Sequence, residues 1–113
     1  MPARNLLLLA PPHAVELALK ELGSNLRTAR LPRNLTIDEV AQKIGAGRRA
    51  VSDAEHGKPS TSVATYAALL WAFDLLADVH SLADPACDLE GLILSRSKAR
   101  VRARRGEALD NDF

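Results

Sequence analysis

Residues 35–57, LTIDEVAQKIGAGRRAVSDAEHG, constrain the fold more than any other part of the chain. Thr36 is a good helix N-cap, and Glu39 three residues later completes a capping box. Gly45 is suited to end this first helix, and a second helix can begin soon after it and run to about His56. The stretch therefore predicts two short helices joined by a tight glycine turn.

The second of these helices has two different faces. Its inward face is small and apolar, at the spacings of three and four residues that are typical of an amphipathic helix. Its outward face is polar and carries, with Arg48 on the flank, Arg49, Ser52, Asp53 and His56. A polar helix held away from its predecessor at a steep angle can enter the major groove of DNA. The alternative is a helical hairpin in an ordinary small all-α domain.

This pattern resembles the Xre (lambda-repressor-like) helix-turn-helix family at Leu35-Thr36, Ala41, Gly45, Val51-Ser52 and Glu55-x-Gly57. The segment that follows, GKPSTSVATYAALLWAFDLLADVHSLADP, is similar to the HipB-type antitoxin branch. The resemblance covers roughly residues 23–105. It implies an all-α fold, namely a lambda-repressor-like five-helix domain with a helix-turn-helix, an N-terminal extension and a basic C-terminal tail.

The resemblance also implies which positions contact DNA. At these positions the chain carries Thr36, Arg48, Arg49, Ser52, Asp53, Lys58 and Ser60. Arginine suits both a guanine edge and a phosphate, although both arginines could simply be solvated surface charge. Two residues depart from the family pattern, because Ile37 stands where glutamine is frequent and Asp53 where many relatives carry a base. A carboxylate repels phosphate but can accept a hydrogen bond from a cytosine amino group.

A second pair of positions has a structural role in the family. In phage repressors of this fold, an arginine on the first helix pairs with the glutamate at the end of the recognition helix. Arg30 and Glu55 fall at the matching positions in this chain. The resemblance therefore implies an ion pair that ties the first helix to the third.

Helical patterns flank the central motif on both sides. Residues 13–31 predict either one kinked helix or two helices that meet at Gly23, ended by Pro32. Residues 62–73 predict a helix whose apolar face holds Val63, Tyr66, Leu69, Leu70 and Phe73. Trp71 falls off that stripe and suits either a dimer interface or a partly buried core position.

A further helix is expected over residues 75–83, and Asp84-Pro85 would end it. Relatives dimerise through the C-terminal half of the domain, which makes this helix the candidate dimer interface. A two-fold dimer would place two recognition helices about 34 Å apart and imply a palindromic operator in double-stranded DNA. Residues 89–94 fit either a helical turn or a strand, since periodicity does not distinguish the two in so short a segment. The strand is kept as an alternative because in one relative a C-terminal strand pairs across the dimer.

We expect three regions along the chain. Residues 1–12 form an apolar arm that Pro11-Pro12 prevents from being one helix, residues 13–86 form the helix-turn-helix domain, and residues 87–113 form a C-terminal extension and basic tail. Residues 74–94 hold five acidic residues and no base, whereas residues 95–106 hold six basic residues and no acid. The composition of residues 95–113 predicts disorder, with affinity for DNA backbone or an acidic protein surface.

Composition limits the class of protein. Apolar residues make up 47% of the chain but aromatic residues only 4%, which favours a helical core over a sheet sandwich. The single cysteine, Cys87, allows no intramolecular disulfide, and three scattered histidines offer no metal site. The apolar run at residues 6–10 is too short to cross a membrane. We expect a cytoplasmic, nucleoid-associated protein that makes no contact with the membrane.

These observations leave three functional hypotheses. The first is a sequence-specific DNA-binding repressor that is the antitoxin of a HipA-type serine/threonine kinase and regulates its own operon as a homodimer. The second is a free-standing Xre-type transcriptional regulator without a toxin. The third is a protein-binding adaptor on the same fold, favoured by Ile37 and Asp53. An enzyme is not expected, because the sequence shows no nucleophile with a base and no glycine-rich phosphate loop, and we expect no cofactor.

Overall fold

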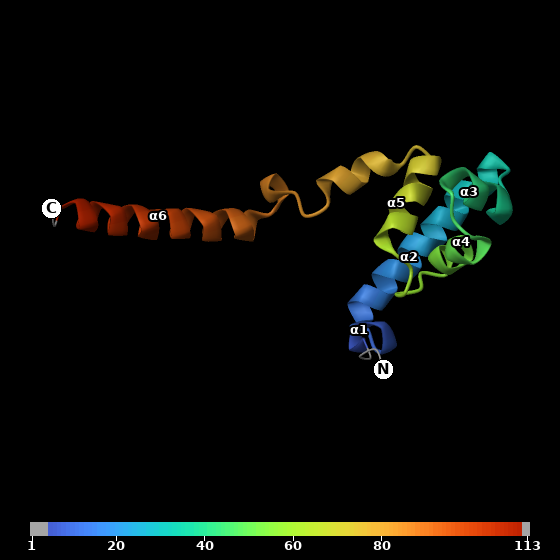
Figure 1. Cartoon of the computed structure of the whole chain (residues 1–113), viewed down its shortest axis with the longest axis horizontal. Helices are drawn as coiled ribbons and strands as arrows, with labels where there is room; N and C mark the ends of the chain where they lie inside the picture. The colour runs from blue at the N-terminus through green and yellow to red at the C-terminus, as the bar shows by residue number, and fades with distance from the viewer. Residues whose placement is uncertain (1–4, 112–113) are drawn as a thin grey trace. The chain divides into compact units, whose positions relative to one another are not determined.

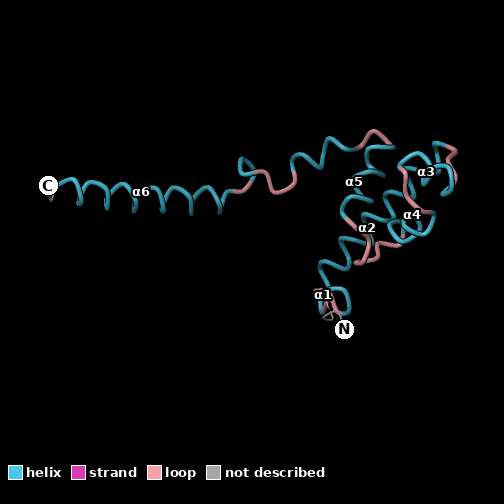
Figure 2. The backbone as a smooth tube through the Cα atoms, viewed as in Figure 1, coloured by secondary structure: helices cyan, strands magenta, loops and turns pink. Residues whose placement is uncertain are grey.

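The computed structural model describes residues 5–111, and within that range it contains helices and loops but no strand (Figures 1 and 2). The α-helices are α1 (Leu6–Leu9), α2 (His13–Arg30), α3 (Ile37–Ile44), α4 (Arg48–Glu55), α5 (Val63–Ala72) and α6 (Leu89–Asn111). Short 3-10 helices are η1 (Leu31–Arg33), η2 (Leu76–Ser81) and η3 (Pro85–Cys87). The predicted all-α class is confirmed.

The described residues fall into two compact units, divided between Ala77 and Asp78. The first unit contains α1 to α5, and the second contains η3 and α6. The three regions predicted from the sequence, with boundaries after residues 12 and 86, stay predictions. Each unit is described below by itself.

The first unit is built around one small apolar core to which four helices contribute. The buried core residues are Leu26 from α2, Val40 and Ala41 from α3, Val51 and Ala54 from α4, Tyr66 and Leu69 from α5, and the following Phe73. They recur at helical spacing because only one face of each helix turns inward. Helix α4 therefore has one face in the core and the other in solvent, as the spacing of apolar residues in this stretch predicted.

Helix α2 is continuous through Gly23, so the alternative of two separate helices does not apply. A Cβ atom at Gly23 would lie 2.6 Å from the carbonyl oxygens of Ala54 and Glu55. A Cβ carbon does not approach an oxygen atom that closely, so only glycine lets α2 pack directly against the end of α4 in this arrangement. The glycine that interrupts the sequence pattern is therefore a packing feature.

Two predictions for the region after α4 need correction. The helix expected over residues 75–83 is the shorter 3-10 helix η2, which lies between two residues with left-handed backbone conformations, Asp74 (φ 60°) and Ala83 (φ 55°). Val63 is 80% exposed at the start of α5 and does not belong to its apolar face. Trp71 is also largely exposed, and the ammonium group of Lys43 lies 5.9 Å from its ring centre.

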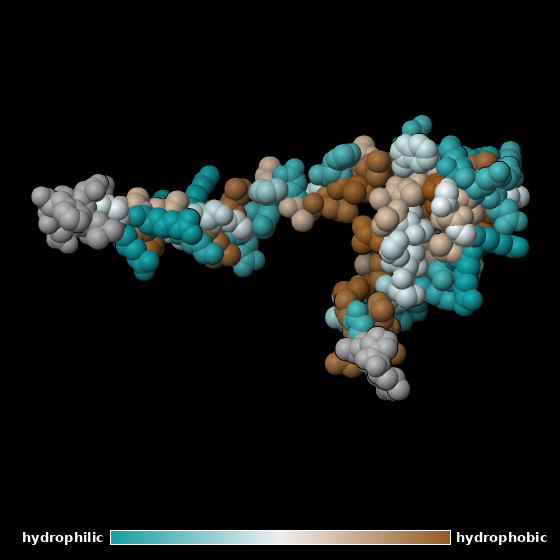
Figure 3. Space-filling view, viewed as in Figure 1, coloured by the Kyte–Doolittle hydropathy of each residue, from teal (hydrophilic) through white to brown (hydrophobic). Residues whose placement is uncertain are grey.

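The N-terminal arm begins with one helical turn, α1, which is separated from α2 by Pro11 and Pro12. Its four leucines are all exposed, and Figure 3 shows the apolar colour of this segment. The side chain of Asn5 caps the turn by accepting a hydrogen bond from the Leu7 amide. Residues 1–4 of the predicted arm lie outside the described residues.

The second unit corrects the expectation of a disordered tail. Residues 89–111 form one helix, α6, so residues 89–94 are helical and not a strand. Asp88 accepts a hydrogen bond from the Gly91 amide at the start of the helix. The segment is rich in leucine, alanine and arginine, which are among the best helix-forming residues. Residues 112–113 of the predicted tail lie outside the described residues.

Candidate nucleic-acid interface

Helices α3 and α4 form the two arms of a helix-turn-helix. The predicted capping box is confirmed, since the Thr36 amide donates to Glu39 Oε1 (3.2 Å) and the Glu39 amide donates to Thr36 Oγ1 (3.1 Å). Gly45 ends α3 with a φ of 74°, and Gly47 precedes the first turn of α4. The turn therefore has the conformation that its glycines allow, and it presents the N-terminal end of α4 to solvent.

Arg30 and Glu55 join α2 to the C-terminal end of α4. Arg30 Nε donates to Glu55 Oε2 at 2.7 Å, and its Nη2 donates to Oε1 at 3.0 Å, so the pair is bidentate. A third hydrogen bond runs from Arg30 Nη1 to the Leu35 carbonyl oxygen (2.8 Å). The hydrogen bond to Glu55 raises the pKa of the guanidinium, against the opposing effect of burial. The orientation of α4 is thus set by a buried, fully paired contact.

The outward face of α4 begins with two exposed arginines. Arg48 Nε lies 3.5 Å from Asp38 Oδ1 on α3, and both side chains are well exposed. Arg49 is exposed and forms no ion pair or side-chain hydrogen bond with another described residue. Arg49 is therefore available to a ligand without the loss of an internal contact, whereas Arg48 shares its charge with a neighbouring carboxylate.

The acidic residue on this face is paired within the chain. Asp53 Oδ1 lies 3.1 Å from Lys58 Nζ, and the Lys58 amide also donates to the Asp53 carbonyl oxygen (3.0 Å). Gly57, with a φ of 66°, makes the turn that brings Lys58 back to the helix. Because the lysine compensates the carboxylate, the departure from the family pattern at Asp53 adds little net negative charge to the face.

The remaining predicted contact residues lie around the C-terminal half of α4. Ser52 is half-buried, and its carbonyl oxygen accepts a 2.7 Å hydrogen bond from His56 Nδ1. Ser60 is exposed in the loop that follows, whereas Thr36 lies at the start of α3 and is engaged in its cap. Arg48, Arg49, Asp53 and Lys58 are thus the charged residues of the candidate interface.

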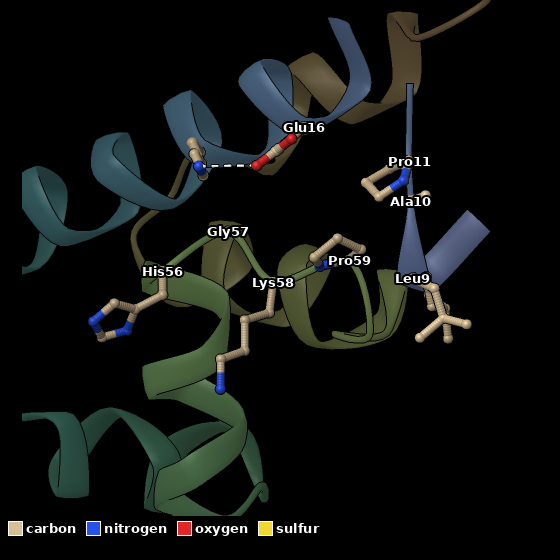
Figure 4. Close-up of a pocket in the computed structure, with 10 residues that line it drawn as sticks. Leu9, Ala10, Pro11, Glu16, His56, Gly57, Lys58 and Pro59 are labelled. Carbon is tan, nitrogen blue, oxygen red and sulfur yellow. Dashed lines mark hydrogen bonds and ion pairs between the residues drawn. The ribbon is translucent and has the colours of Figure 1, made fainter. Parts of the chain in front are cut away.

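A cavity of about 340 Å³ lies beside this end of α4. Figure 4 shows the residues around it, with His56 at the C-cap of α4, Lys58 in the loop after α4, Glu16 from α2, and Leu9 and Pro11 from the N-terminal arm. Glu16 forms an exposed ion pair with Lys20 one helical turn later, at 3.0 Å. Among the described residues no group of three or more histidine, cysteine or acidic side chains could hold a metal ion.

The sequence pattern did not predict the ion pairs on this surface. Asp38 was not predicted to belong to the site, yet it contacts Arg48, and the contact between Asp53 and Lys58 was not predicted either. Both pairs join residues across a turn, where helical periodicity carries no information. Only the turn geometry could have identified them.

Comparison with known proteins is consistent with this geometry. A family model described as helix-turn-helix matches residues 26–75, which run from the second half of α2 to just beyond α5. The match supports the Xre-like assignment of this segment and, with it, a DNA-binding transcription regulator. Comparisons with curated proteins and with solved structures returned no match. None of the helices in the described part of the chain has the length and apolar character needed to span a membrane.

Proposed function

We propose that this chain, whose residues 26–75 match the helix-turn-helix family, is a sequence-specific transcriptional repressor that binds a palindromic operator as a homodimer. The observation that carries the proposal is the arrangement of α4. One face of α4 is buried and held to α2 through Arg30 and Glu55, while the opposite face presents the Arg49 side chain, which has no ion-pair or hydrogen-bond partner among residues 5–111. A rigidly held helix with an exposed arginine near its N-terminus has the geometry of a recognition helix.

Within this proposal the residues have different roles. Arg49 contacts base edges, because arginine can donate two hydrogen bonds to a guanine. Arg48, Lys58, Ser60 and Thr36 contact the phosphate backbone, and Ser52 contacts either base or phosphate. Asp53 accepts a hydrogen bond from a cytosine amino group while Lys58 compensates its charge.

We further propose that the protein is the antitoxin of a HipA-type serine/threonine kinase and acts in the cytoplasm at the nucleoid. The similarity of the segment after Gly57 to the HipB-type branch supports this role. Helix α6 adds a basic, fully accessible surface on which an acidic partner could bind. The alternatives are a free-standing Xre-type regulator without a toxin and a protein-binding adaptor.

The DNA-binding part is tested by fluorescence anisotropy on DNA from immediately upstream of the gene and on scrambled DNA, across a salt series. We expect binding to the upstream DNA to be about a thousandfold tighter or more. Arg49→Ala should reduce affinity for the upstream DNA by about tenfold or more and leave scrambled DNA much less affected.

Arg102→Ala is the matched control, because it removes the same charge from an exposed position on α6. It should lower the affinity for both DNAs by the same factor and slightly reduce the salt dependence of binding. Equal affinity of the wild-type protein for both DNAs would contradict the repressor hypothesis and favour the protein-binding adaptor.

The antitoxin part has a separate test. A HipA-type kinase encoded beside this gene should bind the full chain, and its autophosphorylation should fall when the chain is added in equal amount. If no such kinase gene is adjacent, or if the kinase stays fully active, the free-standing regulator replaces the antitoxin. Neither result affects the DNA measurement.

A further inference from the structure

Helix α6 contacts the short 3-10 helix η3 just before it in its own unit, yet it buries no residue between positions 89 and 106. Between residues 89 and 106 every residue is exposed except Gly91, which is half-buried. The exposed apolar residues of this helix are Leu89, Leu92, Ile93, Leu94 and Val101. A helix in a protein gains most of its stability from packing an apolar face. Helix α6 buries no side chain over residues 89–106, so this part of it lacks the main source of helix stability.

The sequence of α6 is arranged symmetrically about Ser97. Ile93 and Val101 each lie four residues from Ser97, on its two sides. Glu90 and Arg104 each lie seven residues from it. Steps of four and seven residues are close to one and two helical turns, so these five side chains share one face of the helix. On this face, apolar and charged residues repeat in mirror order.

We propose that this face, the Ser97 face, binds a second copy of α6 in an antiparallel pair with its two-fold axis at Ser97. In that arrangement Ile93 of one copy lies opposite Val101 of the other, and Glu90 lies opposite Arg104. The small Ser97 side chains meet at the axis, where they allow close approach of the helices. An interface of this kind is self-complementary, as two-fold symmetry requires.

Charge selects the antiparallel direction. From Asp78 to Leu94 the unit holds four acidic residues and no base, whereas residues 95–106 hold six basic residues and no acid. A parallel pair would place acid beside acid and base beside base, which is unfavourable. An antiparallel pair places the acidic start of each helix beside the basic end of the other. Glu90 and Arg104 form no ion pair with another described residue, so both are available for this contact.

The inference deepens the homodimer of the proposed function and moves its interface. The predicted dimer helix at residues 75–83 is only a 3-10 segment, whereas α6 provides a regular surface. Dimerisation through α6 is measured without DNA, so a negative result would leave the proposed DNA binding unaffected. Conversely, a protein that fails to bind the operator can still form this pair.

Sedimentation equilibrium of the full chain, at salt concentrations near physiological, tests the charge contact. We expect a wild-type dimer, and we expect Glu90→Arg and Arg104→Glu each to raise the dimer dissociation constant by about tenfold or more, because each creates two like-charge contacts. The double variant should recover the wild-type dissociation constant. Arg102→Glu is the control, because it reverses a charge on the opposite side of α6 and should leave the dimer intact.

Cysteine cross-linking tests the axis independently. In a Cys87→Ser background, which removes the exposed native thiol, Ser97→Cys should give a disulfide-linked dimer under mild oxidation. Arg102→Cys in the same background should remain monomeric on a non-reducing gel. A wild-type monomer, a double charge variant that stays dissociated, or equal cross-linking of both cysteine variants would each overturn the proposal.

Discussion

The first unit and α6 are both helical, but they are stabilised in different ways. In the first unit, helices α2 to α5, of eight to eighteen residues, are held by a shared core, a buried ion pair and capped ends. Helix α6 is longer than any of them, yet none of its side chains is buried between residues 89 and 106. The comparison teaches that local helix propensity marks which residues form a helix, whereas the stability and orientation of the helix depend on tertiary contacts.

The sharpest way to break the first unit is to remove one member of its buried pair. Arg30→Ala leaves the Glu55 carboxylate buried without a partner, and we expect a loss of about 3–5 kcal/mol in the free energy of unfolding. Urea denaturation followed by circular dichroism measures it. Lys20→Ala is the control, because it breaks the exposed pair with Glu16 and should cost about 0.5 kcal/mol or less. Equal losses would show that burial does not set the strength of these pairs.

A smaller effect is expected from the close contact of α2 with α4. Gly23→Ala places a methyl group 2.6 Å from two backbone oxygens, so the helices must separate. We expect a loss of about 1–3 kcal/mol in the free energy of unfolding, again from urea denaturation. An unchanged or increased stability would mean that α2 can shift freely against α4.

The same substitution in α6 should have the opposite sign. A Cβ atom at Gly106 meets no atom within 4 Å, so Gly106→Ala adds only the better helix propensity of alanine. We expect a gain of about 1 kcal/mol in the stability of that segment, seen as a larger helical signal in circular dichroism. A decrease would indicate that the glycine serves a contact to a partner.

The smallest effect concerns pH. Burial is the main cause that raises the pKa of the Tyr66 hydroxyl, and the Asp53 carboxylate acts in the same direction. Since ionisation is disfavoured in the folded state, the stability of the first unit should fall as pH rises above about 10, the ordinary value. Tyr66→Phe should remove this part of the decline. Tyr66 is the single tyrosine of the chain, so its absorbance titration reports the shift directly, and an ordinary pKa would contradict it.

The first unit was predictable where its signals are local. The capping box at Thr36, the turn at Gly45 and the apolar spacing in α4 depend on residues within a few positions of each other, and they gave the correct helices. Residues 75–83 show the limit: the apolar spacing there predicts a helix over all nine residues, but the helix is of the 3-10 type, covers only Leu76–Ser81 and lies between left-handed residues at Asp74 and Ala83. Periodicity does not report such backbone conformations.

The prediction of a disordered tail was wrong because it gave more weight to the density of charged residues than to their helix propensity. Residues 95–111 were expected to be disordered, although arginine, lysine and alanine are good helix formers. At the candidate interface, periodicity identified the outward residues of α4 but not their partners. The contacts of Arg48 with Asp38 and of Lys58 with Asp53 cross turns, so the net charge of the face required the structure.

The exposure of α6 also bears on how long the protein survives in a cell. Its six lysines and arginines between residues 96 and 105 are cleavage points for trypsin-like proteases. A helix without buried side chains opens at little cost in free energy, so these bonds become accessible far more often than those of the first unit. Degradation would therefore begin at α6, and any molecule that covers this helix would lengthen the lifetime of the chain.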